Sequence, residues 1–162
     1  MSASTHDSPT GPGVRFPPPF LYAIPGLLGY VVHRRAPWPL VPASLREPAE
    51  VVGLAFAAIA LCTIGWAISR FLLARTSILP HRPANAFVAS GPYRFTRNPM
   101  YVSLAMLLLG LALMADSLWM GVAVPVGMLL VQRLVIRREE AYLTARFGDT
   151  YVEYTRRVRR WV

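Results

Sequence analysis

The sequence predicts an all-α integral membrane protein, a helical bundle of about four transmembrane helices with an amphipathic cytoplasmic helix at its C-terminal end. Composition is the first reason, because 54% of the 162 residues are hydrophobic and only 15% are charged, which is too apolar for a soluble domain. The second reason is that all 17 cationic residues are arginines, placed at the ends of the apolar runs. Such positions favour lipid over nucleic acid as the partner of the +9 net charge.

The chain divides into a leader, a bundle and a tail. Residues 1–19 are rich in Ser, Thr, Gly and Pro without an apolar core, so we expect a flexible leader rather than a signal peptide. Residues 20–136 hold the apolar runs and form the predicted transmembrane bundle, and residues 137–162 are expected to form cytoplasmic helices. The single cysteine, Cys62, lies inside an apolar run, where we expect it to pack rather than to form a disulfide.

The first two apolar runs differ in whether they are long enough to cross a membrane. Residues 20–32 make a helix of roughly 20 Å, shorter than a hydrocarbon core of about 30 Å, and Pro25 should kink it. Residues 49–73 are the clearest span, since about 20 apolar residues are enough to cross. Small residues one turn apart on this span would let a neighbouring helix approach closely, at Gly53 with Ala57 and at Gly65 with Ser69.

Residues 100–115 and 117–136 form two further apolar runs, which a tight turn at Asp116 joins into a helical hairpin. The turn carries no arginine, whereas arginines are frequent just before the hairpin and after it. Because cytoplasmic loops carry the excess of positive charge, both ends of the hairpin and both termini should face the cytoplasm of a bacterial plasma membrane. This multi-pass topology leaves the arginines of residues 34–46 on the outer side, against the same rule.

The tail is expected to continue as polar helices. Residues 137–147 extend as a helix up to Gly148, which can end it in a left-handed conformation. A second helix should begin at a capping box of Thr150 and Glu153. Its apolar side chains share one face, away from its arginines: Tyr151, Tyr154, Val158 and Trp161. Such a helix is predicted to lie on an anionic membrane surface, the alternative being a solvated charged tail.

The segment Gly91-Pro-Tyr-Arg-Phe-Thr-Arg-Asn-Pro-Met-Tyr101 places polar groups just before the third apolar run. Asn98 is a good N-cap and Pro99 suits the first helical position, so free backbone N–H groups would point to the cytoplasmic boundary. An anion would be stabilised there. The alternative is that the Asn-Pro pair only begins a helix.

Arg133, Glu139 and Glu140 form a second polar cluster at the cytoplasmic end of the fourth apolar run, with Gln132 at a similar depth. Seven residues make nearly two helical turns, so we expect Arg133 and Glu140 to share a helix face and Glu139 to point about 100° away. Ionisable groups at membrane depth are costly and often mark functional sites. The alternative is a snorkelling arginine beside a solvated pair of glutamates.

Other kinds of site have no support in the sequence. The histidines are scattered without ligand spacing and Cys62 has no partner nearby, so we expect neither a metal site nor a thiol nucleophile. No P-loop or GxGxxG motif is present, so a soluble nucleotide-binding fold is not expected either.

The two polar clusters are where the sequence resembles a known family. The segment 91–101, the hydrophobic hairpin, Arg138-Glu-Glu-Ala-Tyr-Leu143 and Phe147-Gly-Asp-Thr-Tyr-Val-Glu-Tyr154 resemble, in order and spacing, the isoprenylcysteine carboxyl methyltransferase and phospholipid methyltransferase superfamily. The resemblance covers about residues 75–162.

This resemblance implies an S-adenosylmethionine-dependent methyltransferase whose cofactor is bound between the two clusters, at the cytoplasmic side, with the tail completing the site. It implies that the cofactor is held by Tyr93, Arg97, Asn98, Pro99, Tyr101, Glu139 and Glu140. Arg133 and Glu139 are the candidate catalytic residues. The family's arginine four residues before the glutamate pair is Val135 here, and Arg133 is the candidate to replace it.

The implied acceptor is membrane-borne or an apolar small molecule, and a prenylcysteine carboxylate, a phospholipid amine and a small thiol all remain open. The glutamate pair would hold the cofactor's ammonium or ribose hydroxyls, while Arg97 or the helix N-terminus would hold its carboxylate. Arg133 would neutralise an acidic acceptor. A non-catalytic membrane partner or sensor protein of the same fold is the alternative function. Membrane lipids are expected as partners, and neither nucleic acid nor a metal ion is.

Overall fold

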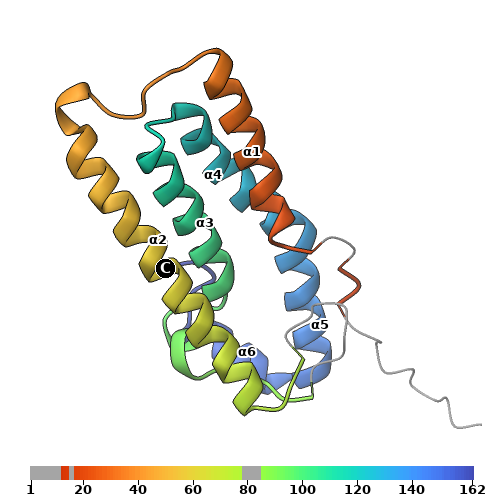
Figure 1. Ribbon diagram of the computed structural model, residues 1–162. Helices are drawn as coiled ribbons and strands as arrows, with labels where there is room; N and C mark the ends of the chain where they lie inside the picture. Colours follow the sequence, from red (N-terminus) through yellow and green to blue (C-terminus); the bar gives the residue numbers. More distant parts are fainter. Residues whose placement is uncertain (1–11, 15–16, 78–84) are drawn as a thin grey trace, which may run out of the picture.

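The computed structural model describes residues 12–14, 17–77 and 85–162, and within them the only regular elements are helices (Figure 1). The all-α prediction is therefore confirmed. Most of the predicted leader, residues 1–11 and 15–16, lies outside the described residues. The four apolar runs form the long helices α1 (Phe20–Arg35), α2 (Arg46–Leu73), α3 (Pro99–Met114) and α4 (Leu118–Val131). The shorter elements are η1 (Ala43–Leu45), η2 (Gly91–Arg94), η3 (Gln132–Ile136), α5 (Arg137–Phe147) and α6 (Asp149–Arg157).

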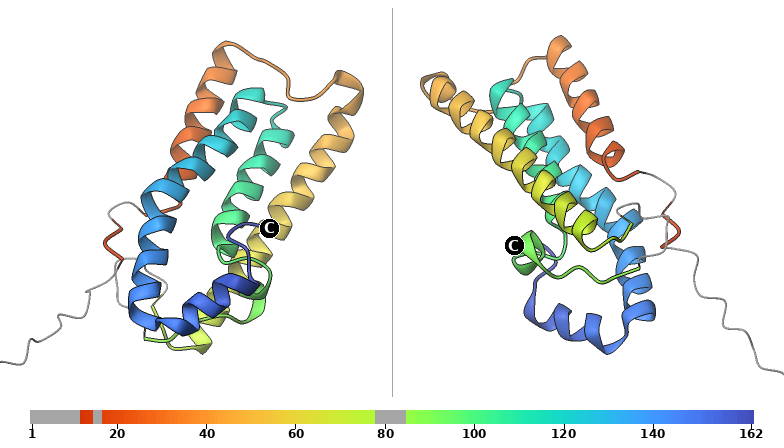
Figure 2. Two further views of the ribbon diagram at one scale, coloured as in Figure 1. Left: turned by 180° about the vertical axis from the view of Figure 1, so that it is seen from behind. Right: turned by 60° about the horizontal axis from the view of Figure 1, so that its bottom comes forward.

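The helices form a bundle with the α3–α4 hairpin at its centre. α2 packs along α3 and α1 packs along α4, so α1 and α2 lie on different flanks of the hairpin (Figures 1 and 2). α4, the π-helical turn η3 and α5 follow one another without a break, and α6 then turns back across the end of the bundle (Figure 2). The start of α3 and the tail, which are far apart in sequence, therefore meet at this end.

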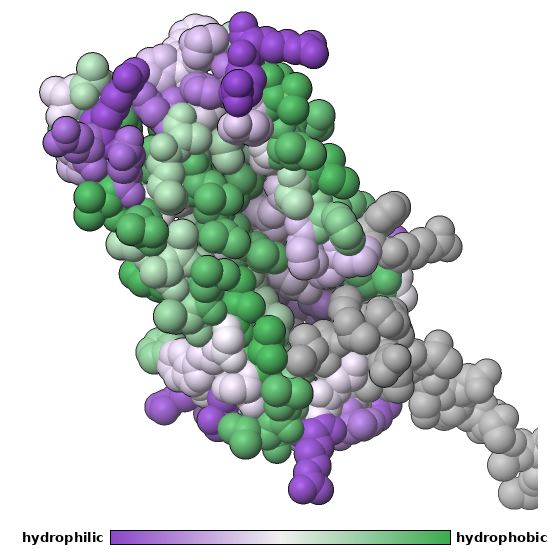
Figure 3. Space-filling model, in the orientation of Figure 1, coloured by the Kyte–Doolittle hydropathy of each residue, from purple (hydrophilic) through white to green (hydrophobic). Residues whose placement is uncertain are grey.

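Two helical stretches are long and apolar enough to cross a membrane. They are Ala43–Leu73 and Leu118–Phe147, whose most apolar parts have mean hydropathies of 2.3 and 1.7. Only 17% of that part of the first helix is buried, and on the face shown in Figure 3 a hydrophobic body separates two polar ends. Both features are typical of a membrane protein. Four spans with cytoplasmic termini stay a prediction, because α1 and α3 have 16 residues each, fewer than the roughly 20 of an upright span.

The second of these stretches, the 30-residue rod formed by α4, η3 and α5, carries its charge unevenly. α4 has no charged residue, whereas α5 begins with Arg-Arg-Glu-Glu. About 20 residues are enough to cross the hydrocarbon core. α5 therefore extends beyond the apolar segment, into the polar end of the bundle.

α2 and α3 approach so closely that glycine is required at their crossing. A Cβ on Gly53 would lie 2.6 Å from the Gly110 carbonyl oxygen, and a Cβ on Gly110 would lie 2.6 Å from the Gly53 oxygen and 3.1 Å from the Ala57 nitrogen. The predicted close approach at Gly53 and Ala57 is thus confirmed. At Gly65 the same prediction is wrong, since a Cβ there would meet nothing within 4 Å. Cys62, which we expected to pack inside, is exposed on α2.

The turn between α3 and α4 is tied to the loop that leads into α2. The Asp116 carboxylate accepts hydrogen bonds from the backbone N–H groups of Leu40 (2.8 Å) and Val41 (3.1 Å), and Arg46 Nε lies 2.8 Å from its other oxygen. Burial alone would raise the pKa of Asp116, but these donors together hold it below its usual range. Arg46, one of the arginines that conflict with the predicted topology, therefore has a structural partner at this end.

The start of the second tail helix differs from the prediction. α5 does end at the predicted glycine, Gly148, which has a positive φ of +52°, but its ψ of −130° lies outside the predicted left-handed helical conformation. α6 begins directly after this glycine and no side chain caps it, so the predicted capping box of Thr150 and Glu153 is wrong. The reversal at Gly148 leaves no room for a separate capping turn.

The apolar face of the tail does not form one long surface helix either. α6 ends at Arg157, and Val158 is extended, with φ −119° and ψ 128°. Tyr151 and Tyr154 are buried, and Trp161 packs against the main hydrophobic core. The predicted interfacial helix is therefore wrong, because the aromatic side chains pack on the bundle itself.

Candidate functional site

A cavity of about 140 Å³ lies where the ends of α2 and α3 meet α5, α6 and the segment before η2. Aromatic side chains are prominent in its lining: Phe71, Phe87, Tyr93, Tyr101, Tyr142, Tyr151 and Tyr154. Its charged and amide side chains are Arg97, Asn98, Glu139 and Glu140. Both polar clusters of the sequence, which the hairpin separates along the chain, thus converge on one cavity.

Most of the predicted site residues are brought together by this arrangement. The cavity is lined by Tyr93, Arg97, Asn98, Tyr101, Glu139 and Glu140. Pro99 is buried at the first position of α3, as expected for a proline there, and is not part of the lining. Arg133 is exposed on η3 and lies outside the lining.

The π-helical turn η3 explains the position of Arg133. Such a turn inserts about one residue into an α-helix, which rotates everything after it by about 100°. Val135 and Ile136 are consequently buried and Arg133 is exposed, while Glu140 faces the cavity. The expectation that Arg133 and Glu140 share a helix face is therefore wrong.

Glu139 is a carboxylate with few hydrogen bonds. Tyr101 Oη donates to Glu139 Oε1 at 2.9 Å, and no other described residue donates to this carboxylate. Burial raises the pKa of Glu139 to about 7, against the effect of the Tyr101 hydrogen bond and with a further contribution from the Glu140 charge. A partly buried carboxylate with one donor favours a ligand that brings a cation or further donors.

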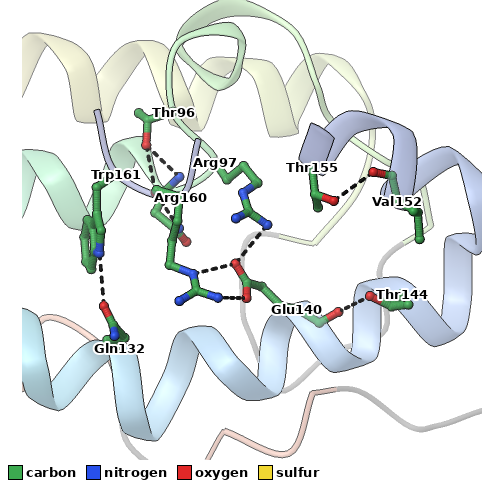
Figure 4. A network of polar contacts seen from close by, with 10 residues as sticks. Thr96, Arg97, Gln132, Glu140, Thr144, Val152, Thr155, Arg160 and Trp161 are labelled. Atoms are coloured by element: carbon green, nitrogen blue, oxygen red, sulfur yellow. Dashed lines mark hydrogen bonds and ion pairs between the residues drawn. The ribbon is translucent and has the colours of Figure 1, made fainter. Parts of the chain in front are cut away.

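Glu140, the next residue, is fully engaged. Arg160 donates to it twice, from Nε to Oε1 at 3.0 Å and from Nη2 to Oε2 at 2.6 Å. Arg97 Nη1 lies 3.1 Å from Oε1, so the carboxylate bridges two arginines (Figure 4). The hydrogen bond to Glu140 raises the pKa of Arg160. Because a two-point arginine–carboxylate pair fixes geometry as well as charge, Glu140 holds its neighbours in place.

Arg97 has a hydrogen-bond donor without an acceptor. Its Nη1 pairs with Glu140, and its backbone N–H donates to the Arg159 carbonyl oxygen at 2.9 Å. Its Nε is buried and has no partner among the described residues. Buried polar groups in native proteins are nearly always bonded. An unpartnered N–H on a residue that lines a cavity therefore indicates an acceptor supplied by a ligand.

Asn98 occupies the N-cap position of α3 without capping it through its side chain. Its side chain makes no capping bond and instead donates from Nδ2 to the Arg160 carbonyl oxygen at 2.9 Å. Near the start of α3, the backbone N–H groups of Tyr101 and Val102 both donate to Asn98 O at 3.0 Å. The N-cap position is therefore as predicted, but the side-chain capping bond is absent because the tail engages the Asn98 amide. The helix start is accordingly a weaker candidate for anion binding than Arg97.

Phe87 is at the centre of an aromatic wall. Its ring centroid lies 5.0 Å from that of Tyr154 and 5.7 Å from that of Tyr151, both in edge-on contacts. Tyr154 Oη donates to the Tyr93 carbonyl oxygen at 2.7 Å, which ties α6 to η2. Burial raises the pKa of both Tyr93 and Tyr154, so these hydroxyls stay neutral at physiological pH. The rings offer flat apolar surfaces and π faces that attract a cation.

Comparison with models of protein families finds a match to phospholipid methyltransferases over residues 48–150, more than half of the chain. The chain belongs to the phospholipid methyltransferase family. The matched region runs from α2 through both polar clusters to the start of α6. It confirms the resemblance seen in the sequence.

Known relatives share parts of this family region. The cobalt-zinc-cadmium resistance protein CzcN of Cupriavidus metallidurans is 37% identical over 76 residues, 47% of this chain and 35% of the relative. The chain thus spans about a third of that relative's length. An uncharacterized protein of Haemophilus influenzae is 43% identical over 65 residues, 39% of this chain and the whole of the relative. No solved structure gives a significant match. In the part of the chain that is described, no three His, Cys, Asp or Glu side chains are placed to hold a metal ion.

Sequence reasoning missed several residues of this candidate site. Phe71 and Phe87 line the cavity, and no pattern in the sequence marks either of them. The spacing of Tyr151 and Tyr154 indicates a shared face but not which surface that face meets. Arg160 belongs to a cluster of arginines, and only its contact with a distant carboxylate distinguishes it.

Proposed function

We propose that this family member is an S-adenosylmethionine-dependent methyltransferase that acts on a membrane-borne or apolar acceptor. One observation carries the proposal: the same cavity holds an unpartnered guanidinium donor on Arg97 and the sparsely bonded carboxylate of Glu139. A ligand that carries both a carboxylate and an ammonium group satisfies both. The aromatic wall beside them suits a planar base and a sulfonium cation.

S-adenosylmethionine combines these features, and when bound it supplies a methyl group on its sulfonium sulfur. Arg97 would hold the carboxylate, Glu139 the ammonium or the ribose hydroxyls, and Phe87 a face of the base. The other predicted cofactor-site residues would shape and support the walls: Tyr93, Asn98, Pro99, Tyr101 and Glu140. A cavity of about 140 Å³ holds a group the size of one ring, so we expect side chains at its mouth to move on binding.

Methyl transfer is a displacement in line with the departing sulfur, so the protein contributes mainly orientation and exclusion of water. Glu139 faces the cavity, where it would orient the cofactor or accept a proton from an amine or thiol acceptor. Arg133 is exposed on η3, so it would meet a carboxylate or thiolate acceptor from outside the cavity. A prenylcysteine carboxylate, a phospholipid amine and a small thiol all remain acceptors to be tested.

Calorimetry on the full chain in detergent tests the cofactor, and a methyl-label transfer assay against total membrane lipids and small thiols tests the acceptor. We expect saturable binding of S-adenosylmethionine and labelling of one acceptor class. Adenosine lacks the amino-acid end of S-adenosylmethionine. It should bind much more weakly, because it offers no carboxylate to Arg97 and no ammonium group to Glu139. No binding and no transfer would contradict the proposal and favour a non-catalytic partner or sensor protein of the same fold.

The proposal places the cavity at the cytoplasmic side of a multi-pass protein with both termini inside. In a Cys62→Ala background, we expect a cysteine introduced at Pro39, exposed in the loop near Asp116, to react with an impermeant reagent from outside. A cysteine introduced at Arg157, exposed on α6, should react only from the cytoplasm. Labelling at Pro39 from the cytoplasmic side alone would overturn this topology.

A further inference from the structure

The residues that follow α6 make specific contacts with the rest of the bundle. Residues 158–162, which we name the C-terminal strap, begin with an extended Val158 and run back beside the segment that precedes α3 (Figure 4). The strap is far in sequence from the residues it contacts. Its contacts therefore depend on the tertiary structure and not on the secondary-structure propensity of nearby residues.

The backbone of the strap accepts hydrogen bonds from consecutive residues of the cavity segment. Arg97 N–H donates to Arg159 O at 2.9 Å. Thr96 Oγ1 and Asn98 Nδ2 donate to Arg160 O at 3.1 Å and 2.9 Å. Thr96 and Asn98 are only 7% and 8% exposed, so in this arrangement their side-chain donors depend on the strap for an acceptor.

Side chains of the strap anchor it on the opposite wall. Arg160 makes its two hydrogen bonds to Glu140 on α5, and Trp161 Nε1 donates to Gln132 Oε1 on η3 at 3.0 Å (Figure 4). The Trp161 ring also packs against the main hydrophobic core. The strap thus joins the start of α3 to the η3–α5 rod across the cavity end of the bundle.

We propose that the C-terminal strap positions the ligand-binding groups of the cavity, with Arg160 acting on Arg97 through Glu140. The ion-pair partner of Arg97 is Glu140, and the orientation of that carboxylate is set by its two-point contact with Arg160. Arg160 is therefore a positioning residue. The inference rests on the proposed function only for the identity of the ligand, since the contacts themselves do not depend on it.

The neighbouring arginines of α6 provide a matched control. Arg156 and Arg157 each pair with Glu153, at 3.6 Å and 3.5 Å, and their side chains are 74% and 71% exposed. Their replacement changes the charge of the tail as much as replacement of Arg160 does, but leaves the strap contacts intact. The control thereby distinguishes the effect of losing positive charge in the tail from the effect of losing the specific contacts of Arg160.

The experiment measures S-adenosylmethionine affinity by calorimetry in detergent, well below the melting temperature of each full-length variant. Arg160→Ala should weaken affinity about tenfold, and Arg160→Lys about threefold, because lysine keeps the charge but not the planar two-point contact. Arg157→Ala should bind like the wild type. In a Glu140→Gln background, Arg160→Ala should cause little further loss of affinity. Both changes interrupt the same series of contacts, from Arg160 through Glu140 to Arg97.

Backbone amide hydrogen exchange over residues 96–98 provides a readout without ligand. The Arg97 amide, which donates to the strap, should exchange faster in Arg160→Ala and unchanged in Arg157→Ala. Wild-type affinity in Arg160→Ala with only a lower melting temperature would overturn the inference, as would unchanged exchange at Arg97. If the wild type does not bind S-adenosylmethionine, the proposed function fails, and the exchange result alone decides whether the strap holds this segment.

Discussion

The two ends of the bundle each hold a carboxylate, in opposite environments. At the loop end, Asp116 accepts two backbone hydrogen bonds and pairs with Arg46, which together lower its pKa. At the cavity end, Glu139 has one donor, Tyr101, and burial raises its pKa to about 7. A carboxylate saturated with donors fixes a turn. A carboxylate that faces a cavity with few donors is available to a ligand, and this difference distinguishes the structural end from the proposed binding end.

The same contrast, between a carboxylate with several donors and one with a single donor, is found in the adjacent residues Glu140 and Glu139. Glu140 bridges Arg97 and Arg160, whereas Glu139 has its one hydrogen bond from Tyr101. Consecutive residues of a helix point about 100° apart and so meet different elements. In the proposed site, the glutamate pair therefore combines one carboxylate that supports its neighbours with one that is open to a ligand.

The largest expected effect is an opposite pH dependence of the two ends. The pKa of Glu139 is raised from 4.5 to about 7, so its contribution to stability is complete below its unfolded pKa and is lost as pH rises through about 7. This loss is about 3 kcal/mol at most. Asp116 has a lowered pKa, so its contribution is present above its unfolded value of 3.8 and is lost as pH falls below it.

The melting temperature of the ligand-free protein in detergent should accordingly fall between about pH 5 and pH 8. Glu139→Gln should remove most of this slope, because glutamine does not titrate. Asp116→Asn should leave it in place. If the melting temperature of Glu139→Gln still fell with rising pH, the titrating group would be another residue. The contrast between Asp116 and Glu139 would then not hold.

Glu139→Gln should also separate binding from stability. Glutamine keeps an acceptor for Tyr101 at nearly constant size but cannot pair with a cation, so S-adenosylmethionine affinity should fall by about 1.5 to 3 kcal/mol, roughly 10- to 150-fold. The ligand-free variant should melt higher than the wild type near pH 8, since a poorly compensated buried charge is gone. Glu140→Gln is the control and should melt lower, because both arginines lose a charged partner. Unchanged affinity in Glu139→Gln would remove the ligand role from this carboxylate.

Asp116→Asn is the matched change at the loop end. Asparagine tolerates the positive φ of 44° at this position, so the substitution tests the lost charge rather than backbone strain. We expect the free energy of unfolding to fall by about 1 to 2 kcal/mol, discounted because the Arg46 side chain is 56% exposed. S-adenosylmethionine affinity should stay at the wild-type value. A marked loss of affinity would show that the two ends are coupled.

The smallest expected effect on cofactor affinity is that of Arg133→Ala, because Arg133 lies outside the cavity lining. Affinity should stay within about threefold of the wild type. If Arg133 orients an acidic acceptor, methyl transfer should fall much further, since the lost contact acts on the transition state. Titration calorimetry and the transfer assay measure the two quantities on the same preparation. A large loss of affinity would place Arg133 in the cavity, against the observed exposure.

Local rules in the sequence were sufficient for most helix boundaries. Pro99 begins α3 because its fixed φ and missing N–H suit the first helical position, and Gly148 ends α5 because it adopts a positive φ. Runs of apolar residues predict α1 to α4, and Asp116 marks the turn of the hairpin. Each of these features depends on residues within a few positions of one another.

The two polar clusters were expected to share one site because of the resemblance to a family, since residue spacing alone does not join them. Arg97, Asn98, Glu139 and Glu140 do line one cavity. Which of them is free for a ligand is not visible in the sequence. Arg160, twenty positions after Glu140, decides that this carboxylate is occupied.

By itself the sequence determined an all-helical chain with apolar runs, a hairpin and two polar clusters, because propensity, capping and hydrophobicity act over short distances. Only the tertiary structure decided that Tyr151 and Tyr154 face the cavity, since periodicity reports that a face is buried but not what it is buried against. The π-helical turn at η3, which turns Arg133 outward, likewise has no local signature. The hydrogen bonds that the Arg160 carbonyl oxygen accepts join residues more than sixty positions apart, and such partners are selected by packing of the whole chain.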